Sequence, residues 1–206
     1  MKYFKNTQQT MIETWLALFI RQIIFYMLPV MVSLTMVSML ESRLTGQPIS
    51  HPFHAIAWKN TWWPMLAGMV FHRAVIIALP QPFVYSFFTA SIRCAGHCLC
   101  LLAGFFLYSW VLQHQAPTGL PPLHQWWAKV FMYFNLCMAV LHLLPMPGMV
   151  VGEWLYKHGY FPALFYAFMR YYQHWFWLLI GALPLLDMVA GKYIIYPTYG
   201  WLATLA

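Results

Sequence analysis

Long apolar stretches with almost no charge recur along this 206-residue chain. A helix needs roughly 20 apolar residues to cross the hydrocarbon core of a bilayer. Several stretches approach that length and together make up about half of the sequence: about 15–40, 62–79, 91–112, 126–144 and 175–190. The sequence therefore predicts an all-α integral membrane protein with about five to six transmembrane helices, in a single polytopic domain covering residues 1–206.

Proline and charged residues punctuate this pattern. Pro29 is expected to kink the first stretch, and the pair His72-Arg73 interrupts the second. The aromatic segment 160–172 is expected to lie at the membrane interface, where Trp and Tyr gather in membrane proteins.

The composition excludes other classes of protein. Hydrophobic residues make up 62% of the chain and charged residues 7%, against roughly 45–50% and about 25% in soluble domains. The net charge of +7 arises because the chain has 11 basic residues and only four acidic ones. These basic residues are scattered singly, so we expect them to meet lipid headgroups and predict no nucleic-acid partner. The four cysteines lie within apolar stretches and indicate neither a disulfide framework nor a cysteine-based zinc site.

The end of the fourth stretch carries the most specific motif. Asn135 is followed, after six residues, by His142-Leu-Leu-Pro145-Met-Pro147, and Gly152 comes shortly afterwards. This segment resembles the third conserved helix of the site-2 proteases, which are intramembrane zinc metalloproteases. The family pattern there is Asn, six residues, then Asn-Leu-Leu-Pro-x-Pro-Pro-Leu-Asp-Gly-Gly, and the two sequences align without a gap.

Weaker similarities follow in the family's order. Thr45-Gly-Gln-Pro48 is similar to the family's Gly-Asp-Pro-Thr turn, and Ala78-Leu-Pro-Gln-Pro82 to its Ala-Lys-Pro-Val-Pro segment. Ala95-Gly-His97 resembles the Ala-Gly-Pro helix start. The resemblance covers nearly the whole chain and implies a three-helix core like that of the compact family members.

The departures from the family pattern concern its chemistry. The family's His-Glu-x-x-His supplies two zinc ligands and a general base, and those positions fall on Leu34-Thr-Met-Val-Ser38. The third ligand, an aspartate, is replaced by Val150. Without these ligands the chain cannot coordinate zinc as the family does. The resemblance therefore implies a catalytically inactive homologue with no cofactor.

Five residues are candidates for a polar groove or a partner-binding site: His97, Asn135, His142, Pro145 and Pro147. Ionisable residues inside membrane spans mark functional sites by default, although a neutral histidine also makes ordinary hydrogen bonds between helices. Asn135 and His142 are seven residues apart and therefore share one helix face. The Pro-x-Pro break favours a cavity able to clasp a partner's transmembrane helix, or it simply ends the helix.

We therefore predict a non-catalytic pseudoprotease that binds or stabilises a membrane-protein partner, as an accessory subunit or assembly factor in a bacterial cytoplasmic membrane. One alternative is a metalloprotease with relocated ligands, drawn from His97, His142 and Glu153. Another is a haem- or quinone-linked redox subunit that uses His97 and His142. In the preferred interpretation Glu153 is an interfacial residue just beyond a helix end.

Overall fold

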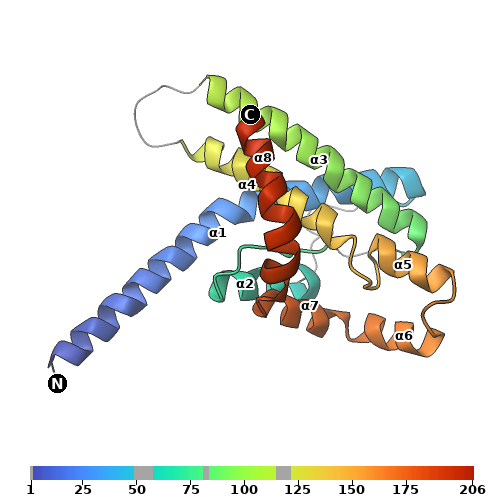
Figure 1. The fold of residues 1–206 in the computed structure, drawn as a ribbon, viewed down its shortest axis with the longest axis horizontal. Coiled ribbons are helices and arrows are strands. Elements are labelled where there is room, and N and C mark those ends of the chain that lie inside the picture. Colours follow the sequence, from blue (N-terminus) through green and yellow to red (C-terminus); the bar gives the residue numbers. More distant parts are fainter. Residues whose placement is uncertain (1, 49–57, 81–83, 115–121) are drawn as a thin grey trace.

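The computed structural model describes residues 2–48, 58–80, 84–114 and 122–206. Within these ranges the chain is helical and contains no strand, which confirms the all-α part of the predicted fold class (Figure 1). The elements, in chain order, are α1 Lys2–Thr45, η2 Trp58–Trp62, α2 Trp63–Val70, α3 Phe87–Gln113, α4 Leu123–Leu141, α5 Val150–Lys157, α6 Ala163–Tyr171, α7 Gln173–Ala182, η3 Asp187–Ile195 and α8 Tyr196–Leu205.

The first helix, α1, extends well beyond the body that the other helices form (Figure 1). Its 44 residues rise about 66 Å at 1.5 Å per residue, and its N-terminal half projects away from the body (Figure 1). Residues 13–45 are long and apolar enough to cross a membrane. Pro29 lies inside this helix, which continues through it to Thr45.

The third and fourth predicted stretches form α3 and α4. α3 begins with a capping box between Ser86 and Thr89, and α4 ends at Leu141, just before Pro145. These helices pack closely on each other: a Cβ added at Gly104 of α3 would lie 2.9 Å from the Cα of Met132 in α4. Such close approach of two backbones requires a residue without a side chain.

The second stretch breaks at the His72-Arg73 pair that interrupts its pattern, so residues 62–79 do not form one membrane-length helix. α2 ends at Val70, His72 takes a left-handed conformation with φ of 51°, and the chain continues without helix to Pro80. The Arg73 Nε donates to the Ala182 carbonyl at 2.9 Å, and residues 75–79 are buried in the core. This apolar run is buried by protein on all sides, and such a run does not distinguish a helix from an extended core segment.

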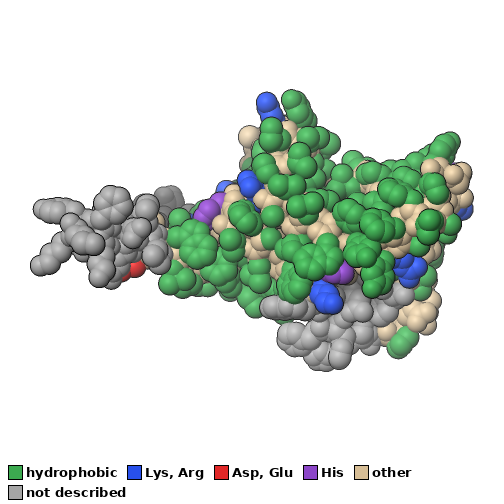
Figure 2. Space-filling model, turned by 90° about the horizontal axis from the view of Figure 1, so that it is seen from below, with side chains coloured by type: hydrophobic (Ala, Val, Ile, Leu, Met, Phe, Trp, Pro, Cys, Tyr) green, Lys and Arg blue, Asp and Glu red, His purple; other side chains and the backbone are tan. Residues whose placement is uncertain are grey.

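The last stretch is broken as well. α7 stops before Pro184, and the chain resumes as η3 and α8 at an angle of 74°. Among the described residues, two helices are long and apolar enough to span a membrane, residues 13–45 and α3, or three if the bent pair is one span. A count of five to six spans stays a prediction. Figure 2 shows that hydrophobic side chains cover most of one face, which is compatible with a membrane protein.

Candidate functional site

A cluster of polar side chains is buried where α1, α3 and α4 pack together. Arg93 and His97 lie four residues apart and share one face of α3. In α1, Glu41 and Ser42 follow Ser38 by three and four residues and share one helix face with it, whereas Ser33 lies further toward the N-terminus. We call this set the polar core: Ser33, Ser38, Glu41 and Ser42 of α1, Arg93 and His97 of α3, Asn135 of α4, and His142 at its end.

Asn135 connects the three helices. Its Oδ1 accepts a hydrogen bond from Ser33 Oγ at 2.6 Å and lies 2.9 Å from His97 Nδ1. Its Nδ2 donates to the Phe131 carbonyl at 2.8 Å, which fixes the orientation of the amide. The His97 Nδ1 is therefore the protonated nitrogen, and Nε2 carries the lone pair. No described residue forms a hydrogen bond with this Nε2, although His97 has no exposed surface.

His142 stands beside His97 at the end of α4. The centroids of the two rings are 6.0 Å apart, and the His142 Nδ1 has no hydrogen-bond partner among the described residues. Two buried imidazoles thus each present one unpartnered nitrogen. In the part of the chain that the structure describes, no group of three or more His, Cys, Asp or Glu side chains could hold a metal ion.

A buried ion pair adjoins the histidines. The Arg93 Nε lies 3.5 Å from Glu41 Oε2, and the two side chains are 3% and 1% exposed. The Arg93 Nε also donates to the Thr89 carbonyl, whereas Arg93 Nη2 has no hydrogen-bond partner within the described ranges. The pair joins α1 to α3 one helical turn from His97.

The Pro145–Pro147 segment forms a compact turn against α5. The Met149 N–H donates to the Met146 carbonyl at 3.0 Å, and the Val151 N–H donates to the His142 carbonyl at 3.2 Å. A Cβ added at Gly152 would lie 2.0 Å from the Met146 oxygen, so the turn and α5 fit together only with glycine there. Pro147 is buried and Pro145 is exposed.

Glu153 is buried and lies inside a helix, so the expectation of a residue just beyond a helix end is wrong. It lies in the first turn of α5, and its Oε1 accepts a hydrogen bond from the Gly148 N–H at 2.7 Å and another from the Tyr166 hydroxyl. Burial, with the hydrogen bond to Glu153, raises the pKa of Tyr166, which therefore stays a protonated donor. Glu153 holds the Pro-x-Pro turn and does not join His97 and His142 in a ligand group.

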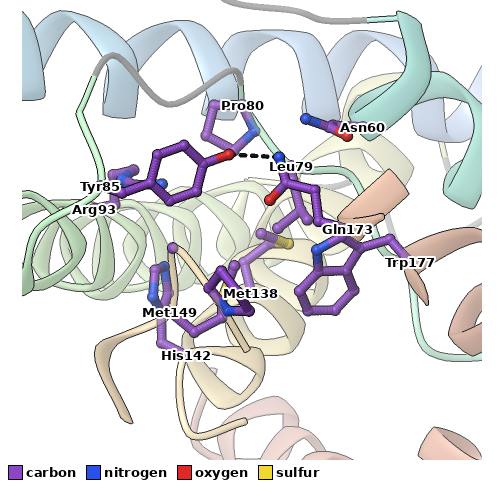
Figure 3. Close-up of a pocket in the computed structure, with 12 residues that line it drawn as sticks. Asn60, Leu79, Pro80, Tyr85, Arg93, Met138, His142, Met149, Gln173 and Trp177 are labelled. Carbon is purple, nitrogen blue, oxygen red and sulfur yellow. Dashed lines mark hydrogen bonds between the residues drawn. The ribbon is translucent and has the colours of Figure 1, made fainter. Parts of the chain in front are cut away.

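A small cavity of about 20 Å³ opens beside the polar core, with room for roughly one water molecule (Figure 3). Arg93, His142 and Pro147 line one part of it. Tyr85 and Gln173 line another part and are joined by a hydrogen bond of 2.5 Å between the Gln173 Nε2 and the Tyr85 hydroxyl. His142 and Pro147 thus meet at one cavity, whereas Asn135 and His97 lie deeper and connect to it through the His97–His142 contact.

The positions that the resemblance assigns to metal ligands carry no ligand groups of the family. Leu34 is a fully buried member of the apolar core, and Ser38 is buried with an Oγ that has no hydrogen-bond partner among the described residues. Val150 begins α5 and is half-buried.

Sequence reasoning missed the most polar contact of the site. Arg93 and Glu41 were each visible as a charged residue in an apolar stretch, which is the signal that marks intramembrane functional residues. Their pairing depends on how α1 and α3 pack, which no local pattern encodes.

No protein-family model, no curated protein and no solved structure matches this chain. The geometry described above and the motif at residues 135–152 are therefore the basis for a functional proposal.

Proposed function

We propose that this chain is a non-catalytic membrane protein, related in scaffold to the site-2 proteases, that binds or stabilises a membrane-protein partner. The partner contact would lie at the Pro145–Pro147 turn and the adjoining polar core. A bacterial cytoplasmic membrane is the proposed location, and an accessory subunit or assembly factor is the proposed role.

One juxtaposition carries the proposal. Val37 of α1 lies next to Gly96 of α3, at 3.3 Å from the point where a Cβ would stand, and His97 lies beside His142. Three segments that the resemblance treats as one core are thus neighbours, although they are widely separated in sequence. The relationship would be contradicted by an unrelated arrangement of these segments, so their proximity supports it.

The absence of the family's zinc ligands argues against zinc-dependent proteolysis. Zinc proteases need several nitrogen or oxygen ligands and a bound water that the metal activates. Leu34, Ser38 and Val150 stand at the three ligand positions of the family. A protein that keeps the family's fold without its catalytic residues can still bind a partner.

The exposed surface beside the turn suits such a role. Leu143, next to the Pro-x-Pro turn, is 58% exposed, and hydrophobic side chains cover much of α1. In a bilayer, helices associate through close packing and interhelical hydrogen bonds more than through the hydrophobic effect.

Site-specific photocrosslinking tests the proposal. A photoreactive benzoylphenylalanine replaces Leu143 in the full chain, which is expressed in its native membranes and irradiated. Leu179 of α7, 55% exposed, is the matched control position. We expect one defined membrane-protein adduct from position 143 that is absent from position 179. Equal adducts from both positions, or none from position 143, would contradict partner binding at the turn.

Metal binding by the two histidines is a second candidate, favoured by their unpartnered nitrogens. Elemental analysis of the purified protein decides it. Stoichiometric zinc that disappears in His142→Ala would replace the pseudoprotease proposal with a relocated metal site. A haem-linked function would instead give a Soret band in the optical spectrum.

A further inference from the structure

A groove runs between the N-terminal half of α1 and the start of α4. It consists of two adjoining hollows of about 420 and 660 Å³, which share Arg21, Phe25 and Trp126 as lining residues. The start of α4 lies at the level of Ile24, because the Trp127 Nε1 donates to the Ile24 carbonyl at 3.2 Å. The groove shares no lining residue with the polar core.

Two cations line the first hollow without a counter-charge. Arg21 comes from α1 and Lys129 from α4, and their described contacts are with aromatic rings: Arg21 lies 5.4 Å from the centroid of Phe25, and Lys129 5.5 Å from that of Trp126. Neither cation forms an ion pair within the described ranges. The electrostatics of the hollow therefore favour an occupant that carries a carboxylate or another anion.

The same hollow contains an unpartnered acceptor. Gln22 lines it, and the Gln22 Oε1 is buried without a hydrogen-bond partner in the described part of the chain. A buried polar atom without a partner costs free energy unless another molecule satisfies it. An occupant that offers a hydrogen-bond donor as well as an anion therefore fits this hollow better than a simple anion does.

The apolar surface of α1 continues beyond the level of Arg21. Arg21 and Arg43 are both exposed, and the rise between them is about 33 Å, close to the roughly 30 Å of a bilayer's hydrocarbon core. Leu18 and Ile20, which line the groove, are 44% and 48% exposed and lie on the outer side of Arg21. Acyl chains do not cover side chains outside the hydrocarbon core, so this part of the groove is suited to contact with protein.

Apolar walls lie on both sides of the two cations along the groove. Ala17 and Leu123 line its outer part, whereas Tyr26, Val130 and Tyr133 line its inner part. A phospholipid is apolar on only one side of its headgroup. A helix that lies along α1 can instead present apolar side chains before and after a single carboxylate, and it can supply a hydrogen-bond donor from a neighbouring position.

The face of α1 in the groove has the pattern of a helix-packing surface. Ala17, Ile20, Arg21 and Ile24 follow one another at spacings of three, one and three residues, which keeps them on one side of the helix. The small side chain of Ala17 allows a second helix to approach closely.

A second copy of this chain does not provide the missing carboxylate. Glu41 and Glu153 are buried, and Asp187 accepts a hydrogen bond from a backbone N–H group. Glu13 lies eight residues from Arg21, which is about 12 Å along α1. Two copies that cross the membrane in the same direction therefore bring no free carboxylate to the level of the two cations.

We propose that the groove binds a helix of a partner protein, and that this helix carries an aspartate or glutamate whose carboxylate pairs with Arg21 and Lys129. The inference rests on the proposed function, because it assumes a membrane-protein partner. It does not depend on contact at the Pro145–Pro147 turn.

Photocrosslinking in native membranes tests the groove. Benzoylphenylalanine replaces Ile24, which lines the second hollow and is 52% exposed, and Leu102 of α3, 53% exposed and outside the groove, is the control position. We expect a defined protein adduct from position 24 that is absent from position 102. Arg21→Gln with Lys129→Gln should lower its yield roughly fivefold.

Two charge controls accompany this variant. Arg43→Gln with Lys157→Gln removes the same charge outside the groove and should leave the yield unchanged. Arg21→Lys with Lys129→Arg keeps both charges and should preserve the adduct. An equal loss of yield in the first control, or loss of the adduct in the second, would refute pairing with a carboxylate.

Mapping the adduct by tandem mass spectrometry identifies the occupant. We expect the crosslinked residue to lie in a partner helix within two turns of an aspartate or glutamate. Arg21→Glu with Lys129→Glu should abolish the adduct, and replacement of that partner acid by lysine should restore it. An adduct with lipid or with a second copy of this chain, a partner segment without a carboxylate, or no adduct from position 24 would overturn the inference.

The outcome is separable from the test of the proposed function. If position 143 gives its adduct while position 24 gives none, the proposed function stands and the groove inference fails. If position 24 gives the charge-dependent adduct while position 143 gives none, the partner binds at the groove and the contact at the Pro145–Pro147 turn is wrong.

Discussion

The buried pair Glu41–Arg93 allows a test in which one substitution reverses the effect of another. Glu41→Leu removes the carboxylate and leaves the Arg93 guanidinium, 3% exposed, without its anionic partner. A guanidinium cannot release its proton, so the charge stays buried. Arg93→Met leaves the Glu41 carboxylate buried without its cationic partner, but an isolated carboxyl group can take up a proton and become neutral.

The magnitudes follow from this asymmetry. Removing one partner of a buried ion pair costs about 3–5 kcal/mol, whereas replacing both by apolar residues of similar size is often neutral or stabilising. We therefore expect Glu41→Leu to lower the free energy of unfolding by about 3–5 kcal/mol and Arg93→Met to lower it by less. The double variant should recover most of the loss.

Reversible unfolding in detergent micelles, followed by far-UV circular dichroism, measures the four free energies of this double-mutant cycle. Arg43→Met, an exposed arginine two residues from Glu41, is the control and should change the free energy by less than about 0.5 kcal/mol. If the losses in the two single variants simply add in the double variant, the ion pair does not hold α1 to α3, and the reasoning is refuted.

Two further predictions concern the packing of the helices. Gly152→Ala places a Cβ 2.0 Å from the Met146 oxygen and should destabilise the protein by about 3 kcal/mol or more. Gly200→Ala in α8, where a Cβ would meet nothing within 4 Å, is the control and should stabilise the protein slightly. Thermal unfolding compares the two variants, and equal effects would contradict the close fit of α5 to the turn. Asn135→Leu removes the acceptor of two buried donors and should lower the free energy of unfolding by about 1–3 kcal/mol for each donor. Ser33→Ala removes only one donor and should lower it by about 1 kcal/mol. An equal loss of stability in the same unfolding experiment would show that the hydrogen bond between His97 and Asn135 does not stabilise the protein.

The sequence predicted the helices that are long, apolar and uninterrupted. α3 and α4 lie where the pattern placed them, because proline and polar residues bound them on both sides. The second and last stretches do not form single helices, and each has its own physical reason. Residues 75–79 are apolar because they lie in the core, and Pro184 ends α7 where composition alone indicated continuity.

The candidate site was predicted in part. The structure brings His97, Asn135 and His142 together, and Pro147 reaches the same cavity as His142. Glu153 was assigned to an interface because its position after a helix end is a local feature, whereas its burial comes from contact with Tyr166 of a later helix. The Glu41–Arg93 pair was missed because it depends on the same kind of contact between distant segments.

The polar core divides into two parts with different physical roles. Ser33, Asn135 and His97 Nδ1 satisfy one another and join three helices, as a structural network does. His97 Nε2, His142 Nδ1 and Ser38 Oγ are buried without hydrogen-bond partners among the described residues, and His142 lines a cavity large enough for a water molecule. Folding alone gives no reason to retain such atoms, because apolar side chains would pack there at lower cost. The first part therefore accounts for stability, and under the proposed function the second is where a polar group of the partner would bind.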